Sequence, residues 1–253
     1  MIDLHCHILP GIDDGAADLE ESLAMARIAV GDGIEITACT PHIIRGIYDN
    51  AGPDIERRVS GLAAALENAE ISLGLRIGAD VHLAPDLATS LASGTVPTLG
   101  GSRYFLLEPP HHVAPPRLED FTLGVLSRGY VPVLTHPERL RWVGDHFDMI
   151  GRLHGSGVLI QLTAASITGE FGSRPQYWAD RILAENLADL VASDGHDPFR
   201  RPPRMSEARD RIAHRHNDAT AIRLVAKNPL AILENVIPSK LRQPEDPEKS
   251  GFV

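Results

Sequence analysis

Two histidines near the start of the chain, His5 and His7, have the types and spacing of metal ligands. They follow a short apolar run, and residues two apart in a strand point to the same side. Both imidazoles can therefore aim at one point, while the residues between and beside them face the other way. Imidazole and carboxylate together suit zinc, manganese or iron, and Asp13 and Asp14 follow after a turn. The first fifteen residues thus indicate a metal site.

Further candidate ligands recur at the ends of predicted strands. After the strand that carries His5, we expect strands alternating with helices over residues 33–39, 75–83, 103–108, 130–135, 157–163 and 188–193. At or just past the ends of these strands lie His42, Asp80, Glu108, His136, Asp194 and His196. This alternation predicts a parallel sheet with right-handed crossovers, and seven such units favour a closed or nearly closed barrel. Because strand ends converge on one face of a barrel, we expect the candidate ligands to meet there.

The candidate ligands are too numerous to bind a single metal ion. A catalytic zinc usually has three protein ligands and one open position, so we expect two or three divalent ions. Ions about 3.5 to 4 Å apart can share a carboxylate and a water, which favours hydrolysis of phosphate esters or amides. Nearby arginines favour phosphate, because a guanidinium binds phosphate oxygens in a bidentate manner. They are Arg45, Arg139, Arg200 and Arg201.

Composition bounds the class of protein. With 253 residues, 43% of them hydrophobic, the chain can bury a full core, and we expect one domain over residues 1–240 and a flexible polar tail over residues 241–253. The net charge of −10 opposes sequence-independent binding to nucleic acid. No window approaches the ~18 apolar residues of a membrane span, and no basic region precedes an apolar one at the N-terminus. Two cysteines beside candidate ligands fit a reducing cytoplasm.

Seven motifs carry a resemblance to a known superfamily. They are His5-Cys-His7, Asp13-Asp-Gly15, Thr40-Pro-His42, Gly78-Ala-Asp80, Leu107-Glu108, His136-Pro-Glu-Arg139 and Ala192-Ser-Asp-Gly-His196. From Met1 to about Ile237 the chain resembles the polymerase and histidinol phosphatase (PHP) superfamily. Within it, the chain is most similar to the manganese-dependent bacterial protein-tyrosine phosphatases encoded with capsule and exopolysaccharide genes. The resemblance implies the PHP fold, a distorted seven-stranded (β/α)7 TIM-like barrel.

The same resemblance implies a site with three ions and assigns residues to it. Manganese is the metal implied first, with iron and zinc as alternatives. His5, His7 and Asp194 would hold one ion, Glu108 and His136 a second, and Asp14, His42 and His196 a third, with Asp80 bridging the first two. Arg139 and Arg201 would contact the phosphate, and loss of His42 or Asp194 would abolish most turnover. The implied substrate is the phosphotyrosine-rich tail of a bacterial tyrosine autokinase that controls polysaccharide chain length. A homo-oligomer is compatible with this role.

One position departs from the family pattern. The bridging residue is usually glutamate, whereas Asp80 is shorter by one methylene. We therefore expect an altered occupancy of one shared ion, unless His82 on the same strand face compensates. His111 and His112 follow Glu108 in a less familiar sequence, Pro109-Pro-His-His, and are expected at the surface.

The expected mechanism is direct attack on phosphorus by a hydroxide that bridges the ions, and three other hypotheses stand beside it. Cys39 and Arg45 have the Cys-x5-Arg spacing of thiol-based tyrosine phosphatases, but Pro41 removes a backbone donor and no glycine lies between them. A small substrate, such as histidinol phosphate or a nucleotide, would suit the same metals. The third hypothesis is a non-catalytic metal-binding regulator of polysaccharide assembly. An amidohydrolase would add a carboxylated lysine, whereas the lysines here all lie from Lys227 onward.

Overall fold

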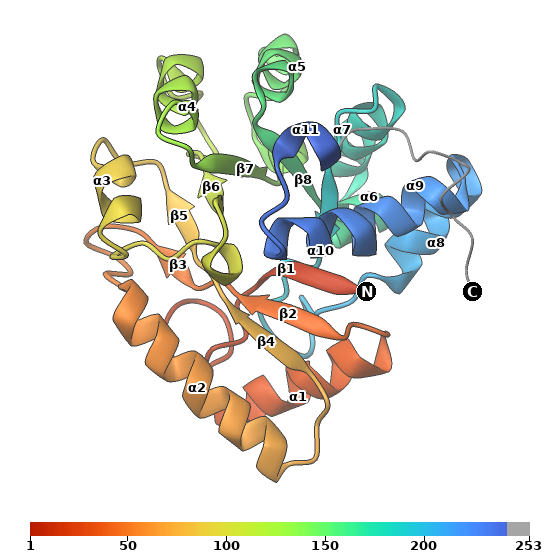
Figure 1. The fold of residues 1–253 in the computed structure, drawn as a ribbon. Coiled ribbons are helices and arrows are strands. Elements are labelled where there is room, and N and C mark those ends of the chain that lie inside the picture. Colours follow the sequence, from red (N-terminus) through yellow and green to blue (C-terminus); the bar gives the residue numbers. More distant parts are fainter. Residues whose placement is uncertain (242–253) are drawn as a thin grey trace.

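Two parallel sheets form the centre of the molecule in the computed structural model, which describes residues 1–241 (Figure 1). The first sheet has the order β1-β2-β4 and comprises Ile2–Cys6, Ile36–Cys39 and Gly74–Ile77. The second has the order β3-β5-β6-β7-β8-β9 and comprises His42–Ile43, Asp80–His82, Tyr104–Glu108, Val131–Thr135, Leu159–Thr163 and Leu190–Ala192. Every strand pairing within these sheets is parallel, which confirms the α/β architecture expected from the alternation of elements.

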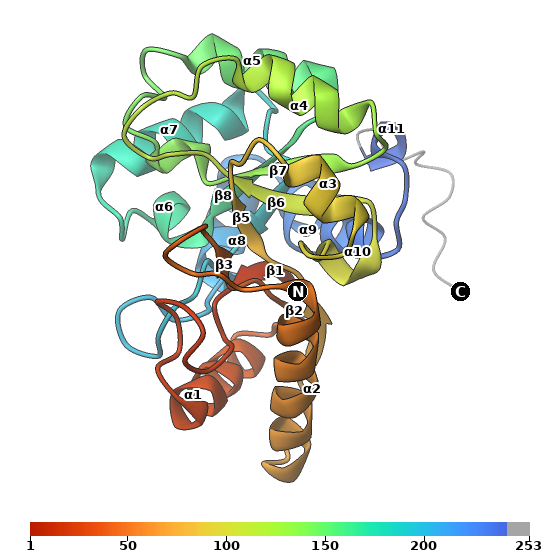
Figure 2. The ribbon, with the colours of Figure 1, turned by 90° about the vertical axis from the view of Figure 1, so that its left-hand side faces the viewer.

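Helices cover the outside of both sheets. Figures 1 and 2 show α1 (Leu19–Gly31) and α2 (Gly52–Asn68) beside the three-stranded sheet, and α4 (Leu118–Leu126) and α5 (Phe147–Ser156) along the six-stranded one. The remaining α-helices are α3 (Leu87–Ala92), α6 (Ala164–Thr168), α7 (Ser173–Ala184), α8 (Ser206–Arg215), α9 (Asp218–Ile222), α10 (Asn228–Leu233) and α11 (Pro238–Leu241). Short 3-10 turns lie at Leu99–Gly101 and Pro137–Arg139. Within residues 1–241, no helix combines the length and the apolar character that crossing a membrane requires.

Capping residues explain where some helices begin. At the start of α1, the Asp18 carboxylate accepts a hydrogen bond from the Glu21 backbone N–H at 3.0 Å. The Glu21 carboxylate in turn accepts one from the Ala17 N–H at 2.9 Å, so two otherwise unpaired donors are satisfied. The helical backbone continues through Asn228-Pro229. A π-helical segment, Arg223–Lys227, connects α9 to α10 there, and Pro229 lies in the first turn of α10, where its missing N–H costs little.

The predicted strand over residues 75–83 is two strands in the structure. β4 ends at Ile77 in the first sheet, and β5 begins at Asp80 in the second. Gly78 lies at the crossing, where an added Cβ would come within 2.9 Å of the side chains of Leu99 and Thr40. The close approach explains why glycine occupies the point at which the chain changes sheets.

The two sheets meet where β1 lies beside β9, and backbone contacts join them there. An isolated parallel bridge joins Cys6 to Gly195, just beyond β9. The His7 N–H donates to the Gly195 carbonyl and the Asp194 N–H donates to the His5 carbonyl, each at 2.8 Å. These bonds fix the start of the chain against a segment almost two hundred residues later. Of the expected polar tail, Leu241 ends α11, and residues 242–253 lie outside the described residues.

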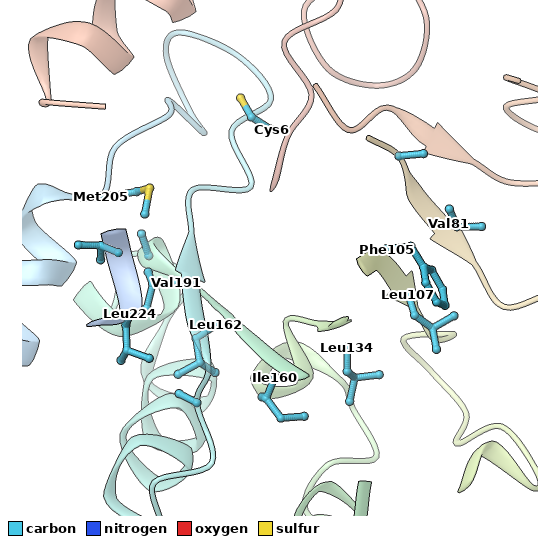
Figure 3. Packing of buried hydrophobic residues seen from close by; sticks show 14 of the residues in the cluster. Cys6, Val81, Phe105, Leu107, Leu134, Ile160, Leu162, Val191, Met205 and Leu224 are labelled. Carbon is cyan, nitrogen blue, oxygen red and sulfur yellow. The ribbon is translucent and has the colours of Figure 1, made fainter. Parts of the chain in front are cut away.

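The central strands lie between two apolar clusters, and each face of a strand packs against one of them. On β6, Phe105 and Leu107 belong to the larger cluster, and Figure 3 shows Leu107 near Leu134 and Ile160 of the neighbouring strands. Tyr104 and Leu106 face the other way, into the smaller cluster. Because side chains alternate along a strand, Glu108 follows on the face of Tyr104 and Leu106, at the carboxyl end. The packing of β6 thus aims Glu108 into the centre of the molecule.

Candidate metal centre

Histidines from separate parts of the chain converge at the carboxyl ends of the strands. The Nε2 atoms of His5 and His7 lie 3.2 Å apart. The ring centroid of His7 is 3.9 Å from that of His196 and 4.5 Å from that of His42. The centroid of His136, which follows β7, is 5.7 Å from that of His5. The structure therefore brings together histidines that the sequence placed after different strands.

Hydrogen bonds at Nδ1 orient three of these rings. The Nδ1 atom of His5 lies 2.9 Å from Oε1 of Gln161, and that of His7 lies 2.7 Å from Oδ2 of Asp13. His196 donates from Nδ1 to the backbone carbonyl of Asp194 at 2.9 Å. With Nδ1 engaged in this way, each ring presents Nε2 as the free ligand atom, an arrangement common around protein-bound metals. The role of Gln161 was missed at the sequence level, although an amide within the apolar strand Leu159–Thr163 is a signal of it.

Buried carboxylates lie between the imidazoles. Oδ2 of Asp80 is 3.5 Å from Nε2 of His5 and 3.3 Å from Nδ1 of His42, and Oε2 of Glu108 is 3.5 Å from the same atom of His42. Among residues 1–241, both Asp80 carboxylate oxygens and the Nδ1 atoms of His42 and His136 are buried without a hydrogen-bond partner. Buried polar atoms without partners are costly, and a cation between them would satisfy both nitrogen and oxygen atoms. The donor set therefore fits divalent metal ions.

Four overlapping groups of side chains have their ligand atoms within 4.8 Å of one another. The groups are His7-Asp14-His42-His196, His5-His7-Asp80, Glu108-His111-His136 and His42-Asp80-Glu108. Asp14, His42 and His196 fall together as expected, as do Glu108 and His136. The additional member is His111, which we expected at the surface and which is only partly exposed.

Asp194 contacts histidines with one carboxylate oxygen and arginines with the other. Its Oδ1 lies 3.4 Å from Nε2 of His5 and 3.5 Å from Nε2 of His7. Its Oδ2 accepts hydrogen bonds from Arg139 and, at 2.6 Å, from Arg201. Burial raises the pKa of Asp194, but His5, His7 and both guanidinium groups outweigh it, and the pKa lies well below its usual range. Asp194 is therefore a carboxylate that links the histidines to the two arginines.

Arg139 and Arg201 also share an aromatic neighbour. The guanidinium carbon of Arg139 lies 4.9 Å from the centroid of Phe171, and that of Arg201 lies 5.7 Å from it. Both arginines line a pocket of about 140 Å³ together with candidate ligands. The other lining residues are Asp14, His42, Glu108, His111, His136, Asp194 and His196. Phe171 lies in the segment between α6 and α7, and we find no sequence signal for its position.

Three residues that the sequence associated with the site lie elsewhere. Arg45 pairs with Asp86 at 2.7 Å and is largely exposed to solvent. His82 lines a separate pocket with Arg45 and Asp86, and it belongs to none of the ligand groups, so it does not compensate for the short side chain of Asp80. Arg200 is exposed and lines a neighbouring pocket of about 340 Å³. Only two of the four arginines therefore reach the candidate ligands.

The thiol hypothesis does not fit the structure. Cys39 is fully buried at the end of β2, and its burial raises the pKa of the thiol far above its usual range. Its expected partner, Arg45, is engaged with Asp86 at the surface. A thiolate nucleophile requires an accessible sulfur and a lowered pKa, and Cys39 has neither.

Backbone strain and close packing hold the ligands in place. His136 has φ of 37° and Asp194 has φ of 52°, left-handed conformations that are unfavourable for these residues and that recur at functional sites. Burial, with His7 and Arg201 nearby, lowers the pKa of His196 to about 2 although the Asp194 carboxylate opposes this shift. The backbone of Gly15 passes directly against His7, where an added Cβ would lie 2.1 Å from the His7 carbonyl oxygen.

The fold and the site together define a class: parallel α/β proteins with metal-ligand clusters at the carboxyl ends of their strands. Within that class, the chain belongs to the CpsB/CapC family of capsular polysaccharide synthesis, whose model matches residues 1–234. The family assignment agrees with the resemblance noted from the sequence motifs.

Individual relatives are similar over most of their length. The chain is 34% identical over 197 residues to the tyrosine-protein phosphatase YwqE of Bacillus subtilis, covering 78% of each chain. It is 27% identical over 238 residues to the tyrosine-protein phosphatase CpsB of Streptococcus pneumoniae, covering 92% of this chain and 98% of the relative. A solved structure from the pair YwqE and CpsB, described as unique metal-dependent tyrosine phosphatases, matches with a TM-score of 0.90 and 31% identity, covering 93% of this chain and 95% of the other.

A more distant likeness concerns the fold alone. The β-aspartyl dipeptidase of Fervidobacterium islandicum matches with a TM-score of 0.57 and 14% identity, over 92% of this chain and 72% of that one. This likeness shows a shared arrangement of strands and helices, and it carries no information about the substrate of this chain.

Proposed function

We propose that this protein is a metal-dependent tyrosine-protein phosphatase of capsular or exopolysaccharide synthesis. The observation that carries the proposal is Asp194, whose two oxygens connect a cluster of metal-ligand histidines to Arg139 and Arg201. Ion binding and phosphate binding can therefore occur side by side in one pocket. The similarity to YwqE and CpsB, both tyrosine-protein phosphatases, supports this reading.

The residues of this chain have separable roles in the proposed reaction. His5, His7, Asp14, His42, Asp80, Glu108, His136, Asp194 and His196 hold the metal ions. Bound divalent ions supply an activated water and positive charge for the phosphoryl oxygens. Arg139 and Arg201 bind the remaining phosphoryl oxygens, and their guanidinium groups are already aligned by Asp194 and Phe171. The His42 side chain is more exposed than those of His5, His7, His136 and His196, and it lines the pocket.

The resemblance to the family suggests the number and kind of metal ions, the substrate and the domain organisation. We infer two or three ions, with manganese as the physiological metal, and a phosphotyrosine-containing tail of a tyrosine kinase as the substrate. We infer that the two sheets act as one distorted barrel around the ions and that residues 1–240 are a single domain. The free, buried thiols of Cys6 and Cys39 are compatible with a cytoplasmic enzyme, and a homo-oligomer is compatible with the proposal.

Hydrolysis of a phosphotyrosine peptide by chelator-stripped protein, before and after addition of manganese, tests the proposal. We expect activity to disappear with the metal, to return with manganese and to be unaffected by Cys39→Ser. Histidinol phosphate and a nucleoside monophosphate, assayed in parallel, should be much poorer substrates.

Three results would contradict the proposal. Activity that survives chelation and disappears with Cys39→Ser would indicate thiol chemistry. A marked preference for a small phosphoester would place the enzyme outside tyrosine phosphatases. A metal-loaded protein without activity on any phosphoester, including an aryl phosphate, would indicate a regulatory role.

A further inference from the structure

We propose that His111 is a metal ligand, and that it completes the ion position formed by Glu108 and His136. This inference rests on the metal-dependent function proposed above. It concerns a residue of the loop after β6, whose neighbour His112 is exposed. The proposal adds a histidine to the nine residues expected from the sequence to hold metal.

The three side chains of this position converge on one carboxylate oxygen. Nε2 of His111 lies 3.1 Å from Oε1 of Glu108, and Nε2 of His136 lies 3.6 Å from the same oxygen. The ring centroids of His111 and His136 are 5.1 Å apart. The other Glu108 oxygen, Oε2, faces His42 instead. One oxygen and two imidazole nitrogens therefore surround a single point, with all ligand atoms within 4.8 Å of one another.

Within residues 1–241, the ligand group that contains both Glu108 and His136 has His111 as its third member. Asp80 lies within 4.0 Å of His5 and His42 and shares a ligand group with His42 and Glu108, but among residues 1–241 it makes no ion pair with His136. Glu108 and His136 alone would give two protein ligands. A catalytic zinc-type site usually has three and one open position, and His111 supplies the third.

The loop that carries His111 is held in place. Pro109 and Pro110 end β6 and restrict the backbone immediately before the histidine. The Pro110 carbonyl accepts a hydrogen bond from Nε1 of Trp142 at 2.8 Å, and the His111 carbonyl accepts one from the Arg141 N–H at 2.9 Å. The anchoring segment, residues 141–142, follows the turn that carries His136 and Arg139. His111 is thereby fixed against the very element that supplies its partner ligand.

Metal binding to His111→Ala, compared with wild type and with His112→Ala, tests the proposal. Apoproteins are titrated with Mn²⁺ in competition with a fluorescent chelator, and pulsed electron paramagnetic resonance measures the coupling of bound Mn²⁺ to histidine nitrogen. For His111→Ala we expect one ion to bind at least about 10-fold more weakly, because even an outer-shell partner is worth that much. We also expect a reduced nitrogen coupling, partly restored by added imidazole. His112→Ala should match wild type.

The outcomes separate this proposal from the proposed function. Equal thermal unfolding of the two apoproteins would show that the substitution leaves the fold intact. If His111→Ala binds every ion with wild-type affinity and unchanged nitrogen coupling, His111 is not a ligand, even if its activity falls. If wild-type protein itself binds no Mn²⁺, the proposed metal-dependent function fails, and this inference fails with it.

Discussion

At the scale of single residues, the site depends on side chains that contact different partners through different atoms. Asp194 faces histidines and arginines, Glu108 faces His42 with one oxygen and His111 with the other, and His7 is held by Asp13 through Nδ1. Sequence spacing predicted most of the members because they recur after strands. It could not predict which oxygen faces which partner, since that depends on contacts between residues far apart in the chain.

Arg139→Lys and Arg201→Lys should each weaken phosphate binding. A lysine cannot reproduce the planar fork that binds Asp194 and, in the proposed complex, two phosphoryl oxygens. We expect each variant to raise KM for a phosphotyrosine peptide and the inhibition constant for inorganic phosphate by about 10-fold or more, the equivalent of one charge-assisted hydrogen bond. Steady-state kinetics with phosphate as a competitive inhibitor measures both quantities.

Arg45→Lys is the matched control for these two variants. Arg45 lies three residues after the candidate ligand His42, as Arg139 does after His136, but the structure pairs Arg45 with Asp86 in a separate region. Its kinetics should remain within about twofold of wild type, since exposed ion pairs contribute little. Equal effects of all three substitutions would mean that phosphate is bound elsewhere.

At the scale of elements, the local sequence predicts the positions of strands and helices. It predicts less well which sheet a strand belongs to and whether one helix continues into the next. The capping residues of α1 and the prolines after β6 are local signals of where a helix begins and a strand ends. The division of residues 75–83 between two sheets depends on the fit of Gly78 against Leu99 and Thr40, which the local pattern does not contain. The helix that continues past Asn228-Pro229 likewise depends on a π-helical segment that single-residue preferences do not indicate.

Gly15→Ala should displace the loop that carries Asp13 and Asp14. The new methyl group would lie 2.1 Å from the His7 carbonyl oxygen and 2.5 Å from its Cβ, so the backbone of one segment has to move. We expect weaker Mn²⁺ binding and a loss of stability of about 1 to 3 kcal/mol, the usual cost of overpacking. Calorimetric titration with Mn²⁺ and denaturant unfolding provide the two readouts.

Gly61→Ala provides the contrasting substitution. Gly61 lies within α2, where nothing surrounds the position of an added Cβ, and alanine favours a helix over glycine by about 1 kcal/mol. This variant should be as stable as wild type or slightly more so, with unchanged metal binding. Normal metal binding by Gly15→Ala would show that the loop yields without moving the ligands.

At the scale of the whole molecule, the candidate ligands come from both sheets. His5 lies in β1 of the first sheet and His7 directly after it, whereas Asp80, Glu108 and His136 belong to the second sheet or to its strand ends. The sequence predicted this convergence from parallel topology alone, together with the α/β class. It did not predict how the strands divide between two sheets, because strand register and the bridge between Cys6 and Gly195 are set by long-range backbone pairing.

Removal of metal should destabilise the whole fold. Bound ions would neutralise the buried carboxylates and link the two sheets, so ligand binding adds to the free energy of unfolding. Mn²⁺ at about 100 times its dissociation constant contributes about 2.7 kcal/mol per site, or a rise in Tm of about 5 to 10 °C for a chain of this size. Differential scanning calorimetry of apoprotein with and without Mn²⁺ measures the shift.

His42→Ala indicates whether that shift comes from the proposed site. This variant retains the fold but loses a side chain shared by two ligand groups, so its Tm should rise less with Mn²⁺ than that of wild type. A shift of the same size in both proteins would mean that the stabilising ions bind away from His42.

The pairing of β1 with the segment after β9 also governs when the protein can become active during its synthesis. His5 and His7 are synthesised long before Asp194 and His196. The backbone hydrogen bonds that hold His5 and His7 in place come from Asp194 and Gly195, so they form late. A growing chain therefore carries exposed histidines without the partners needed to retain an ion. The ligand group that contains His196, and the contacts of Asp194 with Arg139 and Arg201, can form only after translation has passed these residues, which makes completion of the site a late step of maturation.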